Sequence, residues 1–491
     1  MHSFQYAPDY TLIYMEPFIH LHVHTQYSLL DGQASIDALI DKAYKDGMRA
    51  IAVTDHGVMF GIKEFFNKVS KKNSKPLGII KDSEKELKPL LAKDAPTDEE
   101  QQRITELQKQ IAEAKASIFK PIIGCECYCA RNGRHSKLAS QDDRSGWHLI
   151  VLAKNKNGYK NLIKMVSLSW TEGFYGRPRI DKELLEKYHE DLIICSACLG
   201  GEIPQHIMHG RIDKAEESIK WFKNLFGEDY YLEMQRHETH DPNADCTIFP
   251  HQQEVNKVLI ELAHKHNIKL IATNDVHFVN ADDAEAHDRL ICLSTGKDLD
   301  PKRMRYSKQE WMKTTAEMNT IFADIPEALS NTLEIADKIE FYSIDSGPIM
   351  PTFAIPEEFG TEESYRQKLT EHDLFEEFTR DENGNVVLSE EEAHSKIKKL
   401  GGYDKLYRIK LEADYLAKLT YDGAKELYGD PLNDEVKERL NFELHIMKTM
   451  GFPGYFLIVQ DFIRAAREEL GVSVGPVSYT HLRAHETLRH L

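Results

Sequence analysis

The stretch FIHLHVHTQYSLLDG, residues 18–32, combines a short apolar run with three histidines at alternate positions. Side chains of a β-strand alternate between its two faces, so His20, His22 and His24 are predicted to share one face. His22 and His24 lie nearest the carboxyl end of this predicted strand and are the better candidates for metal ligands, whereas His20 lies deeper and suits packing. A single H-x-H pair is a weak signal, so its weight depends on the rest of the chain.

The same design, an apolar run with potential metal ligands at its end, recurs through the first 280 residues. AVTDHG (52–57) ends in Asp55 and His56, and TNDVHF (273–278) repeats the design with Asp275 and His277. Glu126 lies inside the apolar run IIGCECYCA, where a carboxylate needs a cation or strong donors to offset its desolvation. The complete set of candidate ligands is His22, His24, Asp31, His56, Glu126, His148, Cys198, Asp275 and His277.

Short apolar runs that alternate with helical stretches such as 36–46, 212–226 and 252–266 predict an α/β fold with a parallel sheet. Seven runs around one ligand set favour a distorted (β/α)7 barrel, because a barrel brings its strand ends to a common mouth. The predicted strands are Ile19–Val23, Ala50–Thr54, Pro121–Tyr128, His148–Ala153, Leu192–Ser196, Tyr230–Gln235 and Lys269–Thr273.

The mixture of imidazole, carboxylate and thiolate ligands suits Zn²⁺, with Mn²⁺ or Fe²⁺ as alternatives. Nine ligands exceed what one ion needs, so we expect two or three divalent ions, and Glu126 could bridge two of them ~3.5–4 Å apart. Such a centre favours phosphoester hydrolysis, with Asp275, His277 and Glu126 as the catalytic candidates. Basic residues near these motifs could bind phosphate, although a solvated surface arginine is the alternative for each; they are Arg131, Arg177 and Arg179.

A chain of 491 residues is too long for one ordinary domain. We expect an N-terminal extension over residues 1–16, with translation starting at Met15, and a barrel over residues 17–295. Residues 70–118 interrupt the barrel as a helical insertion, marked by a capping box at Thr97 and an apolar seam, and favour a solvated protrusion over a partner site. Residues 296–476 are predicted to be a linker and a mostly helical α+β region.

Composition limits the class of protein. The formal net charge of −18 argues against a non-specific nucleic-acid coat, but not against a local basic channel. No apolar run approaches the ~20 residues of a membrane span, the N-terminus lacks the pattern of a signal peptide, and most of the seven cysteines lie in apolar runs. These features predict a cytoplasmic protein with reduced thiols and no membrane contact. Two glycines follow Cys195-x-x-Cys198, which disfavours a redox motif.

These motifs resemble those of the polymerase and histidinol phosphatase (PHP) domain family. The resemblance is to the form of the domain found at the N-terminus of the alpha subunits of bacterial replicative DNA polymerase III. The resemblance rests on HLHVHTQYSLLDG, AVTDHG, IIGCECY, WHLIVLAKN, CSACLGGEIP and TNDVHF. In the second half, FADIPEALSNT and MGFPGYFLIVQDFI followed by VSVGP resemble the early palm region of the same polymerases. Together these motifs cover residues 17–476.

The resemblance implies a distorted seven-stranded barrel with a trinuclear metal centre, and all nine family positions carry a competent ligand here. It implies 3′–5′ exonuclease activity or phosphate-ester hydrolysis at that centre. For a whole polymerase it implies DNA-templated DNA synthesis with Mg²⁺, and DNA, a sliding clamp, a proofreading exonuclease subunit and a clamp loader as partners. The match stops at Pro476, and the tail VSYTHLRAHETLRHL lacks the family's glycines and palm aspartates. We therefore expect residues 477–491 to lie outside the native fold, and no polymerisation by the chain as written.

Two other functions compete with this interpretation. A free-standing PHP phosphatase would hydrolyse a small phosphomonoester such as histidinol phosphate, but it would not need residues 295–476. A non-enzymatic module would use its metals only to stabilise the barrel and to dock a proofreading partner. Metal-dependent nuclease assays on the wild type and a ligand variant separate that module from an enzyme.

Overall fold

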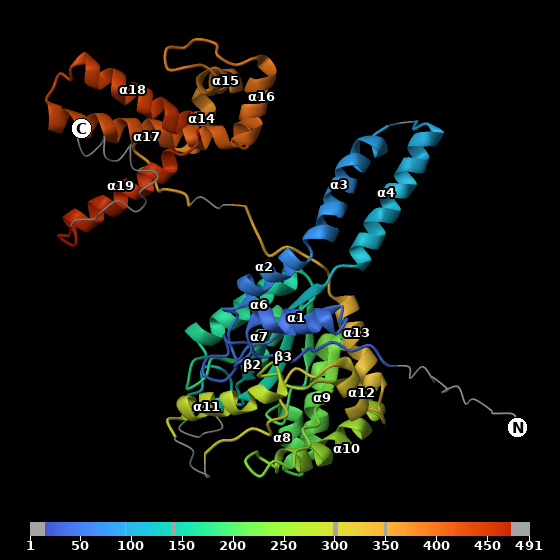
Figure 1. Ribbon diagram of the computed structural model, residues 1–491. Coiled ribbons are helices and arrows are strands. Elements are labelled where there is room, and N and C mark those ends of the chain that lie inside the picture. The colour runs from blue at the N-terminus through green and yellow to red at the C-terminus, as the bar shows by residue number, and fades with distance from the viewer. Residues whose placement is uncertain (1–14, 94, 139–143, 298–302, 348–350, 473–491) are drawn as a thin grey trace, which may run out of the picture. The chain divides into compact units, whose positions relative to one another are not determined.

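The computed structural model describes residues 15–93, 95–138, 144–297, 303–347 and 351–472, which divide into two compact units, Met1–Asp345 and Ser346–Leu491 (Figure 1). The expectations for the start of translation and for the tail after Pro476 concern residues 1–14 and 477–491, and these lie outside the described residues. Each unit is described by itself.

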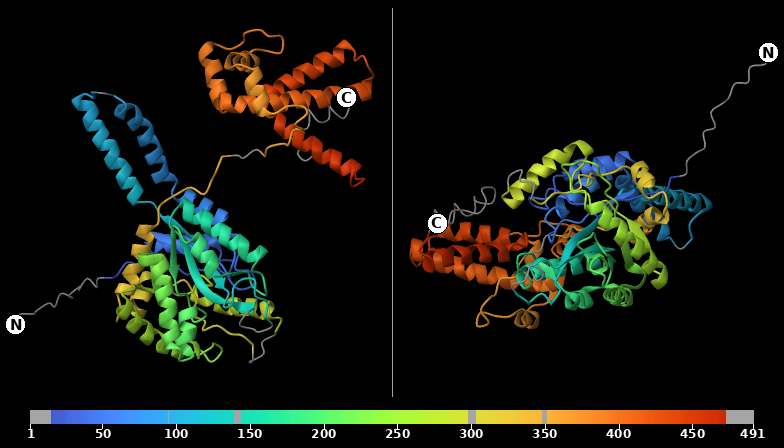
Figure 2. Two further views of the ribbon diagram at one scale, coloured as in Figure 1. Left: turned by 180° about the vertical axis from the view of Figure 1, so that it is seen from behind. Right: turned by 90° about the horizontal axis from the view of Figure 1, so that it is seen from below.

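The first unit is built on a curled sheet with helices packed around it (Figures 1 and 2). The strand order is β1–β2–β3–β5–β6–β7, with β4 paired to β2. Six of the seven predicted strands are confirmed, and β4 is the short strand that the pattern missed. The strands are β1 Ala50–Val53, β2 Lys120–Cys129, β3 Trp147–Ala153, β4 Arg179–Ile180, β5 Leu192–Cys195, β6 Tyr230–Met234 and β7 Leu270–Ala272.

The sheet is mixed rather than wholly parallel, because β3 runs antiparallel to both β2 and β5. A parallel neighbour requires a crossover that returns the chain to the starting end, usually through a helix. The described residues 130–138 and 144–146 hold no helix of that length, and β3 is the antiparallel neighbour of β2. As a result Trp147 and His148, the first residues of β3, lie at the end where the parallel strands finish, and His148 pairs with Tyr128.

Residues 19–24 are extended but do not form the predicted strand, since their only ladder contact is a bridge between Val23 and Val276. Their backbone nevertheless bonds to both edges of the sheet. The carbonyl of His20 accepts from Ala52 of β1 at 2.9 Å, and His22 accepts from Val276 beyond β7 at 3.1 Å. This segment therefore joins the two edges of the curled sheet.

Helices cover the outside of the sheet, and the predicted helices at 36–46, 212–226 and 252–266 are confirmed within a few residues. In chain order the helices on the sheet are α1 Ile36–Lys45, α2 Ile62–Lys72, α6 Lys156–Thr171, α7 Lys182–Tyr188, α8 Glu202–Met208, α9 Ile212–Phe226, α10 Ile248–His266, α11 Ala284–Thr295, α12 Thr315–Ile321 and α13 Glu327–Lys338.

The interior of the curled sheet is a separate apolar cluster that includes Leu21, Ile150 and Tyr231, and α13 contributes Ile335 to it. The side chain of Lys120, at the start of β2, donates to the carbonyl of Ala336 at 2.8 Å. Helix α13 therefore closes the amino ends of the parallel strands, which leaves their carboxyl ends as the open mouth.

The compact unit extends beyond the boundary expected near residue 295, because residues 303–345 pack on the barrel. The Nε2 atom of buried His20 lies 2.7 Å from the carbonyl oxygen of Lys313, and the carbonyl of Glu310 accepts from the backbone of His277 at 2.8 Å. These contacts join residues far apart in sequence, so local pattern gives no sign of them.

The insertion between β1 and β2 is a helical hairpin formed by α3 Ser74–Leu91 and α4 Asp98–Ala116, which projects from the barrel (Figure 1). The predicted capping box at Thr97 and the apolar seam are both present, since Ile104, Leu107 and Ile111 are buried. At the base, the Asn73 side chain bonds to both the N–H and the carbonyl of Phe119. We call this hairpin the arm.

In residues 351–472 of the second unit the described structure is helical, with an isolated bridge between Arg380 and Val386 in place of the expected strands. A capping box at Ser389 opens α16, and a break near Gly451 separates α18 from α19. None of the described helices has the length and apolar content of a membrane span. The helices are α14 Glu362–Lys368, α15 Glu371–Thr379, α16 Glu390–Lys399, α17 Tyr403–Tyr428, α18 Asp434–Thr449 and α19 Pro453–Glu468.

Replacing residues 75–117 by a short Gly-Ser linker is expected to leave the melting temperature of the barrel unchanged within about 2 °C. The arm buries its own seam, and Asn73 already holds the two chain ends of its base together. Differential scanning calorimetry of the full chain checks this. A fall of the barrel transition by about 5 °C or more, which corresponds to about 1–2 kcal/mol, would contradict an independent arm.

Candidate metal centre

All nine candidate ligands converge at the open mouth of the curled sheet. His56 follows β1, Cys198 follows β5, and Asp275 and His277 follow β7. His148 joins them because β3 runs in the opposite direction to its neighbours. The remaining four are His22 and His24 from residues 19–24, Asp31 from the loop after them, and Glu126 from β2.

Glu126 lies at the middle of the cluster and is 1% exposed. Its Oε1 atom lies 2.7 Å from His148 Nδ1 and 3.5 Å from His22 Nε2. Its Oε2 atom lies 3.5 Å from His24 Nε2 and also contacts His56 Nδ1. One carboxylate therefore faces four imidazoles, with its two oxygens directed at different pairs.

Asp275 is a second shared carboxylate. Its Oδ1 atom lies 3.0 Å from His22 Nε2, 3.3 Å from His24 Nε2 and 3.6 Å from His277 Nδ1. The backbone of Asp275 has a φ of 48°, in the left-handed region that non-glycine residues seldom adopt. Such strain persists only where the surroundings fix the conformation, and functional sites are where it gathers.

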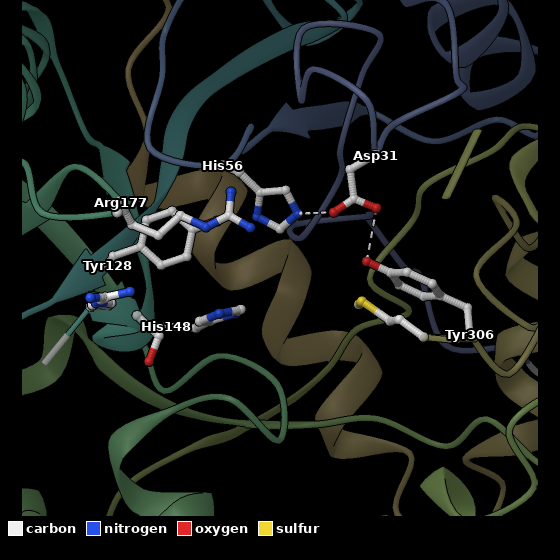
Figure 3. A pocket seen from close by; sticks show the side chains of 10 residues that line it. Asp31, His56, Tyr128, His148, Arg177 and Tyr306 are labelled. Atoms are coloured by element: carbon white, nitrogen blue, oxygen red, sulfur yellow. Dashed lines mark hydrogen bonds and ion pairs between the residues drawn. The ribbon is translucent and has the colours of Figure 1, made fainter. Parts of the chain in front are cut away.

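Asp31 and Cys198 complete the cluster on opposite flanks. Asp31 Oδ2 lies 3.0 Å from His56 Nε2, and Tyr306 donates its hydroxyl to Asp31 Oδ1 at 2.9 Å (Figure 3). Cys198 Sγ lies 3.5 Å from His148 Nδ1. The other cysteine of the C-x-x-C, Cys195, is buried in the barrel interior, so the two thiols do not form a redox pair.

Several buried nitrogen and oxygen atoms of the cluster have no hydrogen-bond partner, including His22 Nε2, His24 Nε2, Glu126 Oε2 and Asp275 Oδ1. An unsatisfied buried polar atom costs about 1–3 kcal/mol, so a fold rarely gathers several without a ligand. Three groups have ligand atoms within 4.8 Å of one another: His24–His56–His277, His22–His24–Glu126 and Glu126–His148–Cys198. These observations fit a buried metal site with more than one ion.

The electrostatics keep the carboxylates ionised. Burial alone would raise the pKa of Glu126, but His148 and His56 hold it well below its usual range. Burial also opposes ionisation of Asp275, yet His22 and His24 lower its pKa strongly. Burial, together with His56 and His277, lowers the pKa of His24 to about 3, so this imidazole is neutral and can donate a lone pair to a cation.

Two further carboxylates orient the ligands, and the sequence reasoning did not assign them this role. Glu233 of β6 accepts from His22 Nδ1 at 2.7 Å and from Thr273 Oγ1 at 2.6 Å. Asp55 accepts from Ser28 Oγ at 2.7 Å, and Ser28 Oγ lies 2.9 Å from His24 Nδ1. Glu233 carried the same signal as Glu126, a carboxylate inside a buried apolar run, and could have been found.

His287 and Tyr306 also reach the cluster, and nothing in the sequence pattern marks them. His287 on α11 is 2% exposed, and its Nε2 atom lies 3.9 Å from Asp31 Oδ1. The hydroxyl oxygen of Tyr306 lies 3.4 Å from His277 Nε2. Both belong to segments that follow the last strand, where no periodicity points to the mouth of the sheet.

A cavity of about 350 Å³ opens directly onto the cluster (Figure 3). Metal-binding candidates form one side of it and basic residues form the rim. Arg177 lies over the ring of Tyr128 with its guanidinium carbon 5.4 Å from the ring centre, and Arg144 is the second arginine of the lining. The lining residues are Asp31, His56, Tyr128, Arg144, Ser145, His148, Gly176, Arg177, Met304 and Tyr306.

The three predicted phosphate-binding arginines therefore separate. Arg177 is exposed on the cavity rim. Arg131 lies over the ring of Trp147 and is absent from the lining. Arg179 is fully buried and donates to the backbone carbonyls of Gly173 at 2.9 Å, Arg134 at 2.9 Å and Ser136 at 2.8 Å, so its prediction as a phosphate ligand is wrong. A regular strand would place residues two apart on one face, but β4 begins only at Arg179, whose side chain points inward.

Comparison with known proteins agrees with this geometry. Residues 20–237 match the PHP domain, and residues 414–477 match the bacterial DNA polymerase III alpha NTPase domain. The chain corresponds to the N-terminal portion of DNA polymerase III alpha subunits. It is 37% identical over 462 residues to DNA polymerase III subunit alpha of Borreliella burgdorferi, covering 93% of this chain and 31% of that protein.

Two other alpha subunits show the same extent of similarity. The protein of Treponema pallidum is 32% identical, covering 94% of this chain and 30% of its own length, and that of Thermus aquaticus is 33% identical, covering 94% and 34%. The chain thus spans about a third of the length of these curated relatives. Apart from His277, every residue of the three ligand groups lies within residues 20–237, which match the PHP domain.

Substituting Arg179→Met is expected to destabilise the first unit by about 3 kcal/mol, because two buried carbonyls and one partly buried carbonyl lose their donor at about 1–3 kcal/mol each. The matched control is Arg177→Met, two residues away and exposed, which should change stability by less than about 0.5 kcal/mol. Urea unfolding of both variants and the parent measures the difference. Equal stabilities would show that Arg179 does not hold this loop.

Proposed function

We propose that the centre is a metal-dependent phosphoesterase that hydrolyses nucleic acid, with 3′–5′ exonuclease action as its activity. The observation that carries this proposal is the convergence of nine ligand-bearing side chains around Glu126 and Asp275, with buried unpartnered nitrogen and oxygen atoms directed at one another. The matched PHP family supports the reaction class.

The donor set suits two or three divalent ions. Its mixture of imidazoles, carboxylates and one thiolate favours Zn²⁺, with Mn²⁺ or Fe²⁺ as alternatives. These ions would be held by Glu126, at the middle of the cluster, together with His22, His24, Asp31, His56, His148, Cys198, Asp275 and His277. When bound, such ions activate water and neutralise charge that develops on a phosphoester.

The chain's own residues position the substrate around that centre. Arg177 and Arg144 lie on the cavity rim, where a guanidinium can bind two phosphate oxygens at once. Tyr306 holds Asp31 through its hydroxyl, and Asp275, His277 and Glu126 form the catalytic group next to the cavity. The buried walls exclude water from the ligands, which strengthens their attraction for a cation.

For the longer protein to which this portion corresponds, we propose DNA-templated DNA synthesis in replication, with Mg²⁺ at a separate polymerase site. DNA, a sliding clamp, a proofreading exonuclease subunit and a clamp loader would be its partners in the cytoplasm. The name shared by its relatives supports this proposal, as does the match over residues 414–477. The same match disfavours a free-standing phosphatase, which would have no use for that region.

Asp275→Asn is expected to lower hydrolysis of a single-stranded oligonucleotide by at least 100-fold and to reduce bound metal. A neutral amide is a poor substitute for a carboxylate that faces three imidazoles. Metal binding to the native state raises the free energy of unfolding, so a variant that binds less metal is less stable. Elemental analysis, a nuclease assay and a thermal melt of the full chain test this. Asp37→Asn, an exposed carboxylate on α1, is the control. Unchanged metal content in Asp275→Asn would refute the assignment.

Glu233→Gln is expected to weaken metal binding about 10- to 100-fold while leaving every ligand in place. Glu233 fixes the Nδ1–H of His22 and so directs its Nε2 atom at Asp275, and an amide can hold that proton less firmly. Competition with a chelator measures the affinity. Glu334→Gln, a carboxylate on α13 that accepts from Tyr231, is the control and should retain the parent's affinity.

A further inference from the structure

Two large aromatic side chains are stacked and exposed beside the cavity. Trp170, near the end of α6, and Phe174, in the following loop, have ring centroids 5.4 Å apart and planes inclined by 18°. They are 42% and 46% exposed, respectively. Each offers a flat apolar face to solvent, and neither belongs to the apolar core.

Trp170 and Phe174 are each linked to residues that line the cavity. Trp170 Nε1 donates to the carbonyl of Gly57 at 2.9 Å, and Gly57 directly follows His56, which lines the cavity. Phe174 is separated by one residue from Gly176 and by two from Arg177, and both of these line the cavity as well. The aromatic pair is therefore joined, by a hydrogen bond on one side and by the chain on the other, to segments that line the cavity where a phosphate would bind.

The loop that carries Phe174 is held rigidly. Buried Arg179 donates to the carbonyl of Gly173, and Arg134 pairs with Glu172 at 2.9 Å. A Cβ atom on Gly173 would lie 2.0 Å from the carbonyl oxygen of Arg179, so only glycine allows this close approach. A prearranged flat surface binds a planar ligand without first losing its own freedom.

Charge identifies the kind of ligand. The chain carries a net charge of −18, yet the rim presents Arg144 and Arg177, each lying over a tyrosine ring. A basic rim beside stacked aromatic faces is the combination that binds single-stranded nucleic acid, because the backbone is anionic and every base has a flat face. A small phosphomonoester would use the arginines but not the aromatic pair.

We propose that Trp170 and Phe174 form a stacking subsite for an unpaired nucleobase of the strand whose phosphate lies against Arg144 and Arg177. This subsite rests on the proposed function, because it names single-stranded nucleic acid as the substrate class of the same centre. It selects single-stranded nucleic acid without reading its sequence, since stacking accepts any base.

The test is equilibrium binding of a fluorescent eight-residue oligodeoxythymidylate, protected at its 3′ end by phosphorothioate linkages, to the full chain by anisotropy. Phe174→Leu and Trp170→Leu keep an apolar side chain but remove the aromatic face, and each should weaken binding about fivefold or more. Phe174→Tyr keeps the ring and should bind within about twofold of the parent. Tyr44→Ala removes an exposed aromatic of α1 and serves as the control.

A second oligonucleotide, abasic at its last two 3′ positions, separates stacking from misfolding. The parent should bind it about fivefold more weakly than the intact strand, and Phe174→Leu should show no such preference. Equal affinity of Phe174→Leu and the parent for the intact strand overturns the proposal, as does a loss that persists with the abasic strand.

Binding is measured with Mn²⁺ and again with EDTA, so it does not depend on turnover. Aromatic-dependent binding without any metal-dependent hydrolysis would refute the phosphoesterase and retain the subsite. If the parent hydrolyses the strand and Phe174→Leu binds it as tightly as the parent does, the subsite is refuted and the phosphoesterase is retained.

Discussion

The structure depends on one buried carboxylate, that of Glu126 in the middle of strand β2. An ionised carboxylate placed in an apolar strand without compensation is so unfavourable that it would take up a proton or the strand would not form there. Here His148, His56 and two further imidazoles surround it, and a cation would complete its partners. The curled sheet supplies this arrangement because it directs several strand ends at the same point, which an open flat sheet cannot do for so many.

Most of the secondary structure of the first unit follows from periodicity, and the departures have tertiary causes. Six strands and three helices coincide with short apolar runs and with the 3.6-residue pattern between them. The reversed direction of β3 was missed because strands and crossover helices were assumed to alternate throughout, whereas β3 pairs antiparallel to both β2 and β5. Residues 19–24 were taken as a regular strand, yet they bond to β1 and Val276 with irregular spacing. The compact unit runs past the boundary expected near 295, because Glu310 and Lys313 pack on histidines about 30 and 300 residues away in sequence.

The candidate ligands were easier to predict than the residues around them. A histidine or carboxylate beside a buried apolar run is chemically conspicuous, so spacing alone drew attention to His56 or Asp275. Tyr306 and His287 are ordinary residues of their segments until the fold brings them to Asp31. Arg177 and Arg179 looked equivalent in the sequence, and only the direction of each side chain separates a rim residue from a buried one. Composition and spacing identify chemistry, whereas orientation comes from packing.

The fold fixes the orientation of most of the imidazoles through the partners that it gives to Nδ1. His22 Nδ1 faces Glu233 and His277 Nδ1 faces the carbonyl of Asp275 at 2.8 Å, and both partners can only accept hydrogen bonds. Nδ1 of each ring therefore carries a proton, and Nε2 faces the other ligands. His24 follows the same rule. The hydroxyl of Ser28 donates a hydrogen bond to Asp55, so its oxygen accepts one from His24 Nδ1.

His56 is the exception among these imidazoles, since its two nitrogens face the carboxylates of Asp31 and Glu126 and neither has a hydrogen bond of good geometry. Burial opposes protonation of His56, but Glu126 and Asp31 raise its pKa well above the usual value. Asp275 and Glu233 raise the pKa of buried His22 in the same way, so binding of a cation by these ligands would release protons from both imidazoles. His24, whose pKa is lowered to about 3, already presents a neutral imidazole.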